Sequence, residues 1–318
     1  MATGNLDTDQ KVDAVVALGT NGLQPLEGDK KGSFAANANL FTLTPTSNNA
    51  SVNLADIDTD GDLDVVTNTV VVLGNGDGTF GTPKALPFAG ATFATFATLA
   101  YIDTDSFLDV VASTTSTINV ALGNGDGTFR VTATQTNVAA GRVAVGDVDN
   151  DTRADIVTAA GLVLRGNADG TFAASPGFAS LPSANDVLLA TLDADDVPDI
   201  VVGDATTVKV FLTAGSGVYV SPPSIAVNGA LFLSATDINQ DGKVDIVAGA
   251  ATTITVLFGD GAGGFKKGPV ITAPQTISSV NAGDVNSDGY PDILATSAVS
   301  SSVYVWLSTQ RSECLLQP

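Results

Sequence analysis

The chain has 318 residues, 44% of them hydrophobic, so it can bury a large core and is not a disordered acidic tail. Its formal charge of -21, from 34 acids and 13 bases, argues against nucleic acid or an anionic membrane surface as a partner, since both require clustered lysine and arginine. With no histidine and a single cysteine, Cys314, the chain lacks imidazole catalysis, histidine metal ligands and an internal disulfide framework, so any metal must be held by oxygen.

An acidic nine-residue motif recurs along the whole chain. Its seven copies, numbered below as loops one to seven, begin at Asn5, Asp56, Tyr101, Asp147, Thr191, Asp237 and Asp284. A glycine-rich motif follows, written GNGDGTF from Gly74 and Gly123, GNADGTF from Gly166 and GDGAGGF from Gly259, with weaker forms from Gly28 and Ala214. The period of about 46 residues identifies one repeated supersecondary unit.

Each unit is predicted to form four short strands. In the last repeat, three of them are residues 277–283 before the acidic loop, 292–298 after it, and 302–307. The fourth is clearest in the second repeat, at residues 81–87 after the glycine hairpin. The second strands are apolar on consecutive residues, as in DVVTN from Asp64, so both of their faces must be covered. We therefore predict an all-β, seven-bladed β-propeller of four-stranded antiparallel blades, forming a single domain over residues 1–318.

Two further features bear on how the blades fit together. The aromatic residues that close the glycine hairpins are predicted to wedge between blades: Phe34, Phe80, Phe129, Phe172, Tyr219 and Phe265. The first and last blades are predicted to be incomplete, because the chain starts inside the innermost strand of blade one and leaves only residues 313–318 as a fourth strand for blade seven. We expect the sequence to be a fragment of a longer exported protein, whose upstream residues would include the missing signal segment.

The acidic loops have the composition of calcium sites. Calcium takes six to eight oxygens at about 2.4 Å, and a tightly turning chain supplies them from alternate positions together with a backbone carbonyl. In loop two the expected ligands are the side chains of Asp56, Asp58, Asp60 and Asp64 and the carbonyl of Asp62, with Gly61 allowing a sharp turn. The loop differs from an EF-hand, which needs a glutamate at position twelve and flanking helices.

Loops four, six and seven also keep an acid or amide at all four side-chain positions. Their expected ligands are Asp147, Asp149, Asp151, Asp155 and the carbonyl of Arg153; Asp237, Asn239, Asp241, Asp245 and the carbonyl of Lys243; and Asp284, Asn286, Asp288, Asp292 and the carbonyl of Tyr290. Loops one, three and five are expected to bind weakly or not at all, through Asn5, Asp7, Asp9 and Asp13, through Asp103, Asp105 and Asp109, and through Asp193, Asp195 and Asp199. Loop one has Gln10 in place of the glycine, and Tyr101 and Thr191 replace the first ligand of loops three and five. The alternative for each loop is an Asp-rich turn whose carboxylates only cap backbone amides.

These acidic loops, together with the LGNGDGTF hairpins, resemble the FG-GAP/VCBS repeats of integrin α-subunit propellers and of many secreted bacterial proteins. The resemblance covers essentially the whole chain. It implies an extracellular, calcium-stabilised propeller that serves as an adhesion or ligand-binding module, with calcium loops on one face and partners usually on the other. It does not imply catalysis.

Two functional classes follow. The favoured one is a non-catalytic binding or adhesion module with a protein or glycan partner, because the turns predicted for the partner face are small and neutral: residues 113–117, 203–207, 249–253 and 297–301. The alternative is a carbohydrate-active propeller, a lectin or a polysaccharide lyase-like protein, which needs exposed aromatics or a cluster of Lys, Arg or Tyr in a cleft. No apolar run reaches the roughly 18 residues needed to span a bilayer, so membrane insertion is not expected.

Overall fold

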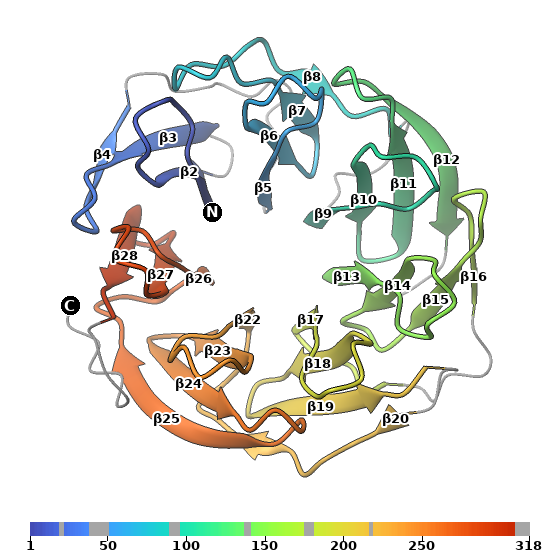
Figure 1. Cartoon of the computed structure of the whole chain (residues 1–318), viewed down its shortest axis with the longest axis vertical. Coiled ribbons are helices and arrows are strands. Elements are labelled where there is room, and N and C mark those ends of the chain that lie inside the picture. Colours follow the sequence, from blue (N-terminus) through green and yellow to red (C-terminus); the bar gives the residue numbers. More distant parts are fainter. Residues whose placement is uncertain are drawn as a thin grey trace.

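The computed structural model describes residues 1–18, 22–37, 51–88, 96–136, 141–174, 181–215 and 219–308. These residues form 28 strands, arranged as seven small antiparallel sheets around a central axis (Figure 1). The predicted seven-bladed β-propeller is therefore confirmed. No helix among these residues has the length and apolarity needed to cross a membrane.

Within each blade the strands follow one another from the axis outward. The first four blades contain β1 (Ala2–Gly4), β2 (Asp13–Ala17), β3 (Leu23–Gly28) and β4 (Phe34–Ala36); β5 (Val52–Ala55), β6 (Asp64–Thr67), β7 (Val70–Val72) and β8 (Lys84–Ala85); β9 (Phe96–Ala100), β10 (Asp109–Ser113), β11 (Thr117–Gly123) and β12 (Phe129–Thr136); and β13 (Val143–Gly146), β14 (Asp155–Thr158), β15 (Val163–Gly166) and β16 (Phe172–Ala174). The last three contain β17 (Asp186–Ala190), β18 (Asp199–Gly203), β19 (Thr207–Thr213), β20 (Tyr219–Val220) and β21 (Ile225–Ala226); β22 (Phe232–Thr236), β23 (Asp245–Ala250), β24 (Thr253–Gly259) and β25 (Phe265–Thr272); and β26 (Ser279–Gly283), β27 (Asp292–Ser297) and β28 (Ser302–Trp306).

Two blades depart from four strands. Blade five has a fifth, because both β20 and β21 pair with β19. Blade seven has three strands among the described residues, and the fourth predicted at residues 313–318, with Cys314, lies outside them. Residues 216–218 of the weak hairpin from Ala214 also lie outside the described residues.

The core lies between the blades. Because side chains alternate across a strand, consecutive apolar residues of a second strand serve two different interfaces. Val65 packs in the cluster between blades one and two, and its neighbour Val66 packs in the cluster between blades two and three. Each fully buried valine contributes roughly 1.5–3 kcal/mol, so these repeated pairs hold successive blades together.

The hairpin aromatics pack where they were predicted in five blades. Each lies in or against the cluster shared with the preceding blade: Phe80, Phe129, Phe172, Tyr219 and Phe265. Phe34 of blade one belongs to none of the six clusters formed by the described residues.

The interface that closes the ring differs from the other six. Six apolar clusters join consecutive blades from one to seven, but among the described residues none joins blade seven to blade one. A cleft of about 380 Å³ lies there instead, lined by residues that include Val16 and Leu26 of blade one and Thr296 and Val303 of blade seven. We call this interface the seam.

A charged and aromatic cluster links blades three to six near the starts of their innermost strands. The Arg142 guanidinium carbon lies 5.3 Å from the ring centroids of both Phe96 and Phe232. Its Nη1 lies 3.4 Å from Oδ2 of Asp186, which also accepts the Leu233 N–H at 2.8 Å. The acidic loops follow the opposite ends of the same strands, so this cluster and the loops lie at opposite ends of the axis.

Candidate metal centres

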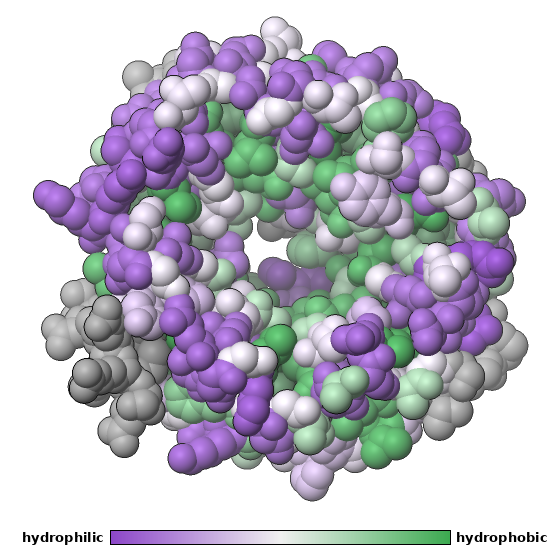
Figure 2. Space-filling model, in the orientation of Figure 1, coloured by the Kyte–Doolittle hydropathy of each residue, from purple (hydrophilic) through white to green (hydrophobic). Residues whose placement is uncertain are grey.

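The seven acidic loops lie between the first and second strands of their blades, where the propeller presents hydrophilic groups around a central opening (Figure 2). In every blade the aspartate at position nine is buried at the start of the second strand. In loop two, Asp64 accepts the Ile57 N–H at 2.7 Å with Oδ2 and the Gly74 N–H at 2.8 Å with Oδ1. Each position-nine aspartate thus connects its own loop to the end of the third strand.

All seven blades repeat this pair of bonds. The first bond, from the second residue of the loop, joins Leu6 to Asp13, Ile57 to Asp64, Ile102 to Asp109, Val148 to Asp155, Leu192 to Asp199, Ile238 to Asp245 and Val285 to Asp292 at 2.6–3.1 Å. The second comes from Gly28, Gly74, Gly123, Gly166, Thr213, Gly259 and Ser308 at 2.8–3.0 Å. The sequence analysis allowed for loop carboxylates that cap backbone amides, but it did not predict that position nine would join the loop to the third strand. The sequence did hold one signal for a structural role, because the position-nine aspartate is present even in loops one, three and five, which lose the first aspartate.

Burial perturbs these carboxyl groups. Desolvation raises the pKa of Asp64, Asp109, Asp155 and Asp199 to about 6, because it outweighs the opposing effect of the two backbone N–H bonds. Neighbouring carboxylates of the same loop push these pKa values in the same direction as desolvation. Ionising these buried carboxyl groups therefore costs free energy in the folded protein unless a cation compensates their charge.

The first position divides the loops into two groups. In loops two, four, six and seven, Oδ2 of the first aspartate accepts the N–H of position six at 2.7–3.0 Å: Asp56 from Gly61, Asp147 from Thr152, Asp237 from Gly242 and Asp284 from Gly289. The same four loops have a left-handed residue at position four, namely Thr59, Asn150, Gln240 and Ser287. Loops one, three and five have Asn5, Tyr101 and Thr191 first, and the described residues show neither feature there. The backbone thus separates the same loops that the sequence separates.

Loop two best fits a cation. Oxygen atoms of Asp56, Asp58 and Asp64 lie within 4.8 Å of one another, and oxygens that share one calcium at about 2.4 Å can be no farther apart. Oδ1 of Asp56 and Oδ1 of Asp58 are buried, and neither has a hydrogen-bond partner among the described residues. A buried acceptor without a partner is costly, so both atoms would gain from a bound cation.

The backbone at position seven is held by the carboxylate at position five. Its N–H donates to Oδ1 of the position-five carboxylate, as Asp62 does to Asp60 at 2.9 Å and Arg153 does to Asp151 at 3.0 Å. The Asp62 carboxylate lies against Gly76 of the hairpin, so it points away from the loop centre as the sequence predicted. The carbonyl ligands Asp62, Arg153, Lys243 and Tyr290 remain predictions.

Loops six and seven place an amide at position three. Nδ2 of Asn239 lies 3.4 Å from Oδ2 of Asp241, and Nδ2 of Asn286 donates to Oδ2 of Asp288 at 3.0 Å. Because both amides turn a nitrogen toward the next carboxylate, a cation that takes the position-five oxygen would have to replace that contact.

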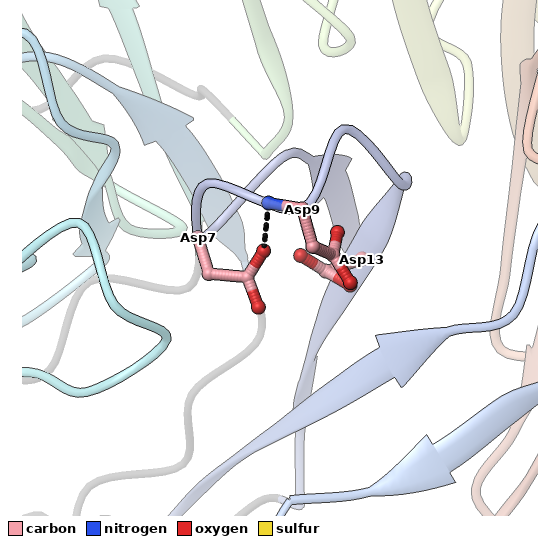
Figure 3. Close-up of side chains that lie close together, drawn as sticks. All are labelled: Asp7, Asp9 and Asp13. Carbon is pink, nitrogen blue, oxygen red and sulfur yellow. Dashed lines mark hydrogen bonds between the residues drawn. The ribbon is translucent and has the colours of Figure 1, made fainter.

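The remaining loops are less complete. In loop one, Asp7, Asp9 and Asp13 bring oxygens within 4.8 Å of one another, and Asp9 donates its N–H to Oδ1 of Asp7 at 2.8 Å (Figure 3). Lys11 forms an ion pair with Asp9. In loop three Arg130 pairs with Asp103 at 3.2 Å. Asp193 and Asp195 of loop five accept local backbone N–H groups.

Comparison with known proteins gives a family and a fold. A family model described as an FG-GAP-like repeat matches residues 5–67, 101–158 and 237–295. No curated protein sequence matches the chain. Similar solved structures include an Agrocybe aegerita lectin that recognises non-reducing terminal N-acetylglucosamine, with a TM-score of 0.64 and 21% identity over 86% of this chain and 83% of that one. BBS1N in complex with ARL6DN has a TM-score of 0.64 and 16% identity over 96% and 89%. The WD40 β-propeller domain of Doa1 has a TM-score of 0.59 and 16% identity over 94% and 89%. At these identities the structures support the fold alone.

Proposed function

Because the chain belongs to the FG-GAP-like repeat family, we propose that it is a calcium-stabilised, extracellular binding or adhesion module without catalytic activity. The observation that carries the proposal is loop two, where two buried carboxylate oxygens have no hydrogen-bond partner among the described residues and would be satisfied by a cation. The shared backbone conformation of loops two, four, six and seven extends the proposal to four sites.

Calcium would stabilise the folded state. Bound in the acidic loops, it would supply positive charge where the carboxylates are closest together and would be coordinated by their oxygens. The residues of the chain already order each loop through backbone hydrogen bonds, so binding would require little rearrangement of the main chain. A ligand that binds the folded state alone stabilises it, by about 2.7 kcal/mol per site at a hundredfold excess over Kd.

Calorimetry on calcium-stripped protein tests the proposal. We expect about four sites with Kd of about 10⁻⁴ to 10⁻³ M or tighter, as in other extracellular calcium modules. The melting temperature should rise with added calcium, and magnesium should have less effect because it tolerates wide, flexible oxygen cages poorly. Binding of one ion or none, or a melting temperature indifferent to calcium, would show that the loops are only acidic turns.

A substitution locates one of the sites. Asp288 is exposed, so Asp288→Ala should remove one calcium site and leave the fold intact. Asp77→Ala, which removes an exposed carboxylate from a glycine hairpin, is the matched control and should leave the stoichiometry unchanged. Equal stoichiometry in both variants would remove loop seven from the set of sites.

The proposed partner surface is the face opposite the acidic loops. Its turns are short and mostly neutral, as in residues 114–116, 251–252 and 298–301, and Val299 is 73% exposed. A neutral surface favours a partner that is recognised by shape and hydrogen bonds rather than by strong charge.

One cleft favours glycan recognition as the second candidate. Tyr101 is 58% exposed beside a cleft of about 440 Å³ between blades three and four, which Asp147, Thr152 and Arg153 also line. An exposed aromatic ring beside polar groups matches the requirement stated above for a carbohydrate site, and one relative in fold is a lectin. A glycan array probed in calcium would decide: binding that Tyr101→Ala abolishes supports this candidate, and no binding leaves a protein-binding module.

A further inference from the structure

In loop four, a positively charged side chain pairs with one of the expected calcium ligands. Nη2 of Arg165 lies 2.5 Å from Oδ2 of Asp149, the position-three carboxylate of the loop. The Asp149 side chain is only 1% exposed, whereas that of Arg165 is 41% exposed. The other oxygen of Asp149 accepts the Asp151 N–H at 3.2 Å. Oδ2 of Asp149 has no hydrogen-bond partner among the described residues, so the guanidinium compensates its charge through the ion pair alone, whereas Oδ1 of Asp58 at the same position of loop two has neither a hydrogen bond nor an ion pair there.

Arg165 stands where most blades have leucine. It precedes the third-strand residue whose N–H bonds to the position-nine aspartate, and four other blades have Leu73, Leu122, Leu212 and Leu307 there. Those leucines lie against the glycine hairpin of the following blade, as Leu73 does against Gly127. A leucine at this position is compatible with the blade, so the arginine is not required by the fold.

The described ion pairs are distributed unevenly among the four complete loops. Loop four has two, because Arg153 also pairs with Asp151 at 3.0 Å. Loops two, six and seven have none among the described residues. Loop two has five carboxylates in nine residues and no base, so it differs most from loop four in local charge.

We propose that Arg165 serves as a built-in counter-cation for loop four, so that calcium enters this loop only by displacing the guanidinium from Asp149. The proposal rests on the proposed calcium function and assigns an unequal affinity to its sites. Loop four binds more weakly than its sequence suggests and stays partly neutralised when calcium is scarce. The displaced side chain can move into solvent, since it is already partly exposed.

The test is calorimetric titration of calcium into stripped wild-type and Arg165→Leu proteins. We expect the substitution to tighten one site by about tenfold, the order expected when a competing, partly buried ion pair is removed. Lys209→Leu is the control, because it makes the same change in net charge while its partner Asp204 lies outside the acidic loops. Adding Asp149→Asn to Arg165→Leu should abolish the gain and so identify loop four as the site.

A reciprocal variant covers the case in which Arg165→Leu fails to fold. Leu73→Arg places a guanidinium at the same position of blade two and should weaken one site by about tenfold. If wild-type protein binds no calcium at any loop, the proposed function fails. If it binds calcium but neither variant shifts the affinity of one site relative to Lys209→Leu, the role of Arg165 is overturned and the calcium function stands.

Discussion

At position six of the acidic loops, backbone conformation decides which residue is tolerated. Gly61, Gly242 and Gly289 have φ between 82° and 95°, and a Cβ atom there would meet nothing within 4 Å. Thr152 fills the same position in loop four at φ 72°, which is unfavourable for a β-branched side chain. The Asp147 carboxylate bond to its N–H helps hold it there.

Gly61→Ala tests whether the positive φ at position six is costly for a residue other than glycine. We expect it to lower the free energy of unfolding by about 1–2 kcal/mol, because an L-residue at positive φ is strained even where space is free. Denaturant unfolding of calcium-stripped protein measures the change. Gly283→Ala is the control, since a Cβ there also meets nothing within 4 Å and its φ is not positive. Equal losses in both variants would contradict a conformational cause.

At the scale of the blade, the sequence predicted most of the strands and all of the loops. Alternation and glycine hairpins mark β26, β27 and β28 within a few residues, because each blade repeats the same local pattern. The fourth strand of blade two is shorter than predicted, only Lys84–Ala85. The division of the loops was also predictable, because the first carboxylate that defines it is visible in the sequence. The second hydrogen-bond partner of the position-nine aspartate was not predictable, since it lies 10 to 16 residues away along the chain.

Asp109→Ala separates the structural role of position nine from calcium. Loop three lacks the first ligand, so this aspartate can be removed without changing a predicted strong site. The buried N–H groups of Ile102 and Gly123 would lose their partner, at about 1–3 kcal/mol each. We expect this loss by denaturant unfolding with and without calcium. Asp105→Ala, an exposed position of the same loop, should cost much less, and equal effects of the two would refute the assignment.

At the scale of the whole molecule, a repeat predicts the interfaces between neighbouring copies but not the one that closes the ring. Blades one to seven are joined by six apolar clusters built from equivalent positions, whereas the seam pairs the first copy with the last. The charged and aromatic cluster around Arg142 was equally hard to predict, because Arg142 and Asp186 are not part of the repeated motifs and meet only through the circular arrangement. Both features depend on closure, which no single repeat encodes.

The stability of calcium-stripped protein should depend on pH through its buried aspartates. Burial raises the pKa of Asp64, Asp109, Asp155 and Asp199 from 3.8 to about 6, so between pH 4 and pH 6 the folded chain binds more protons than the unfolded chain. The free energy of unfolding of stripped protein should therefore fall as pH rises through this window.

Melting temperatures of stripped protein at about pH 4.5 and pH 6.5 check the sign, with calcium removed by a chelating resin because soluble chelators weaken in acid. We expect the lower temperature at pH 6.5. Saturating calcium should reduce or reverse the difference, because the ion binds ionised carboxylates and competes with protons at loops two and four. Asp109 and Asp199 lie in loops predicted to bind weakly, so their share of the pH dependence should survive calcium. A melting temperature of stripped protein that rises from pH 4.5 to 6.5 would contradict the cost assigned to the buried aspartates.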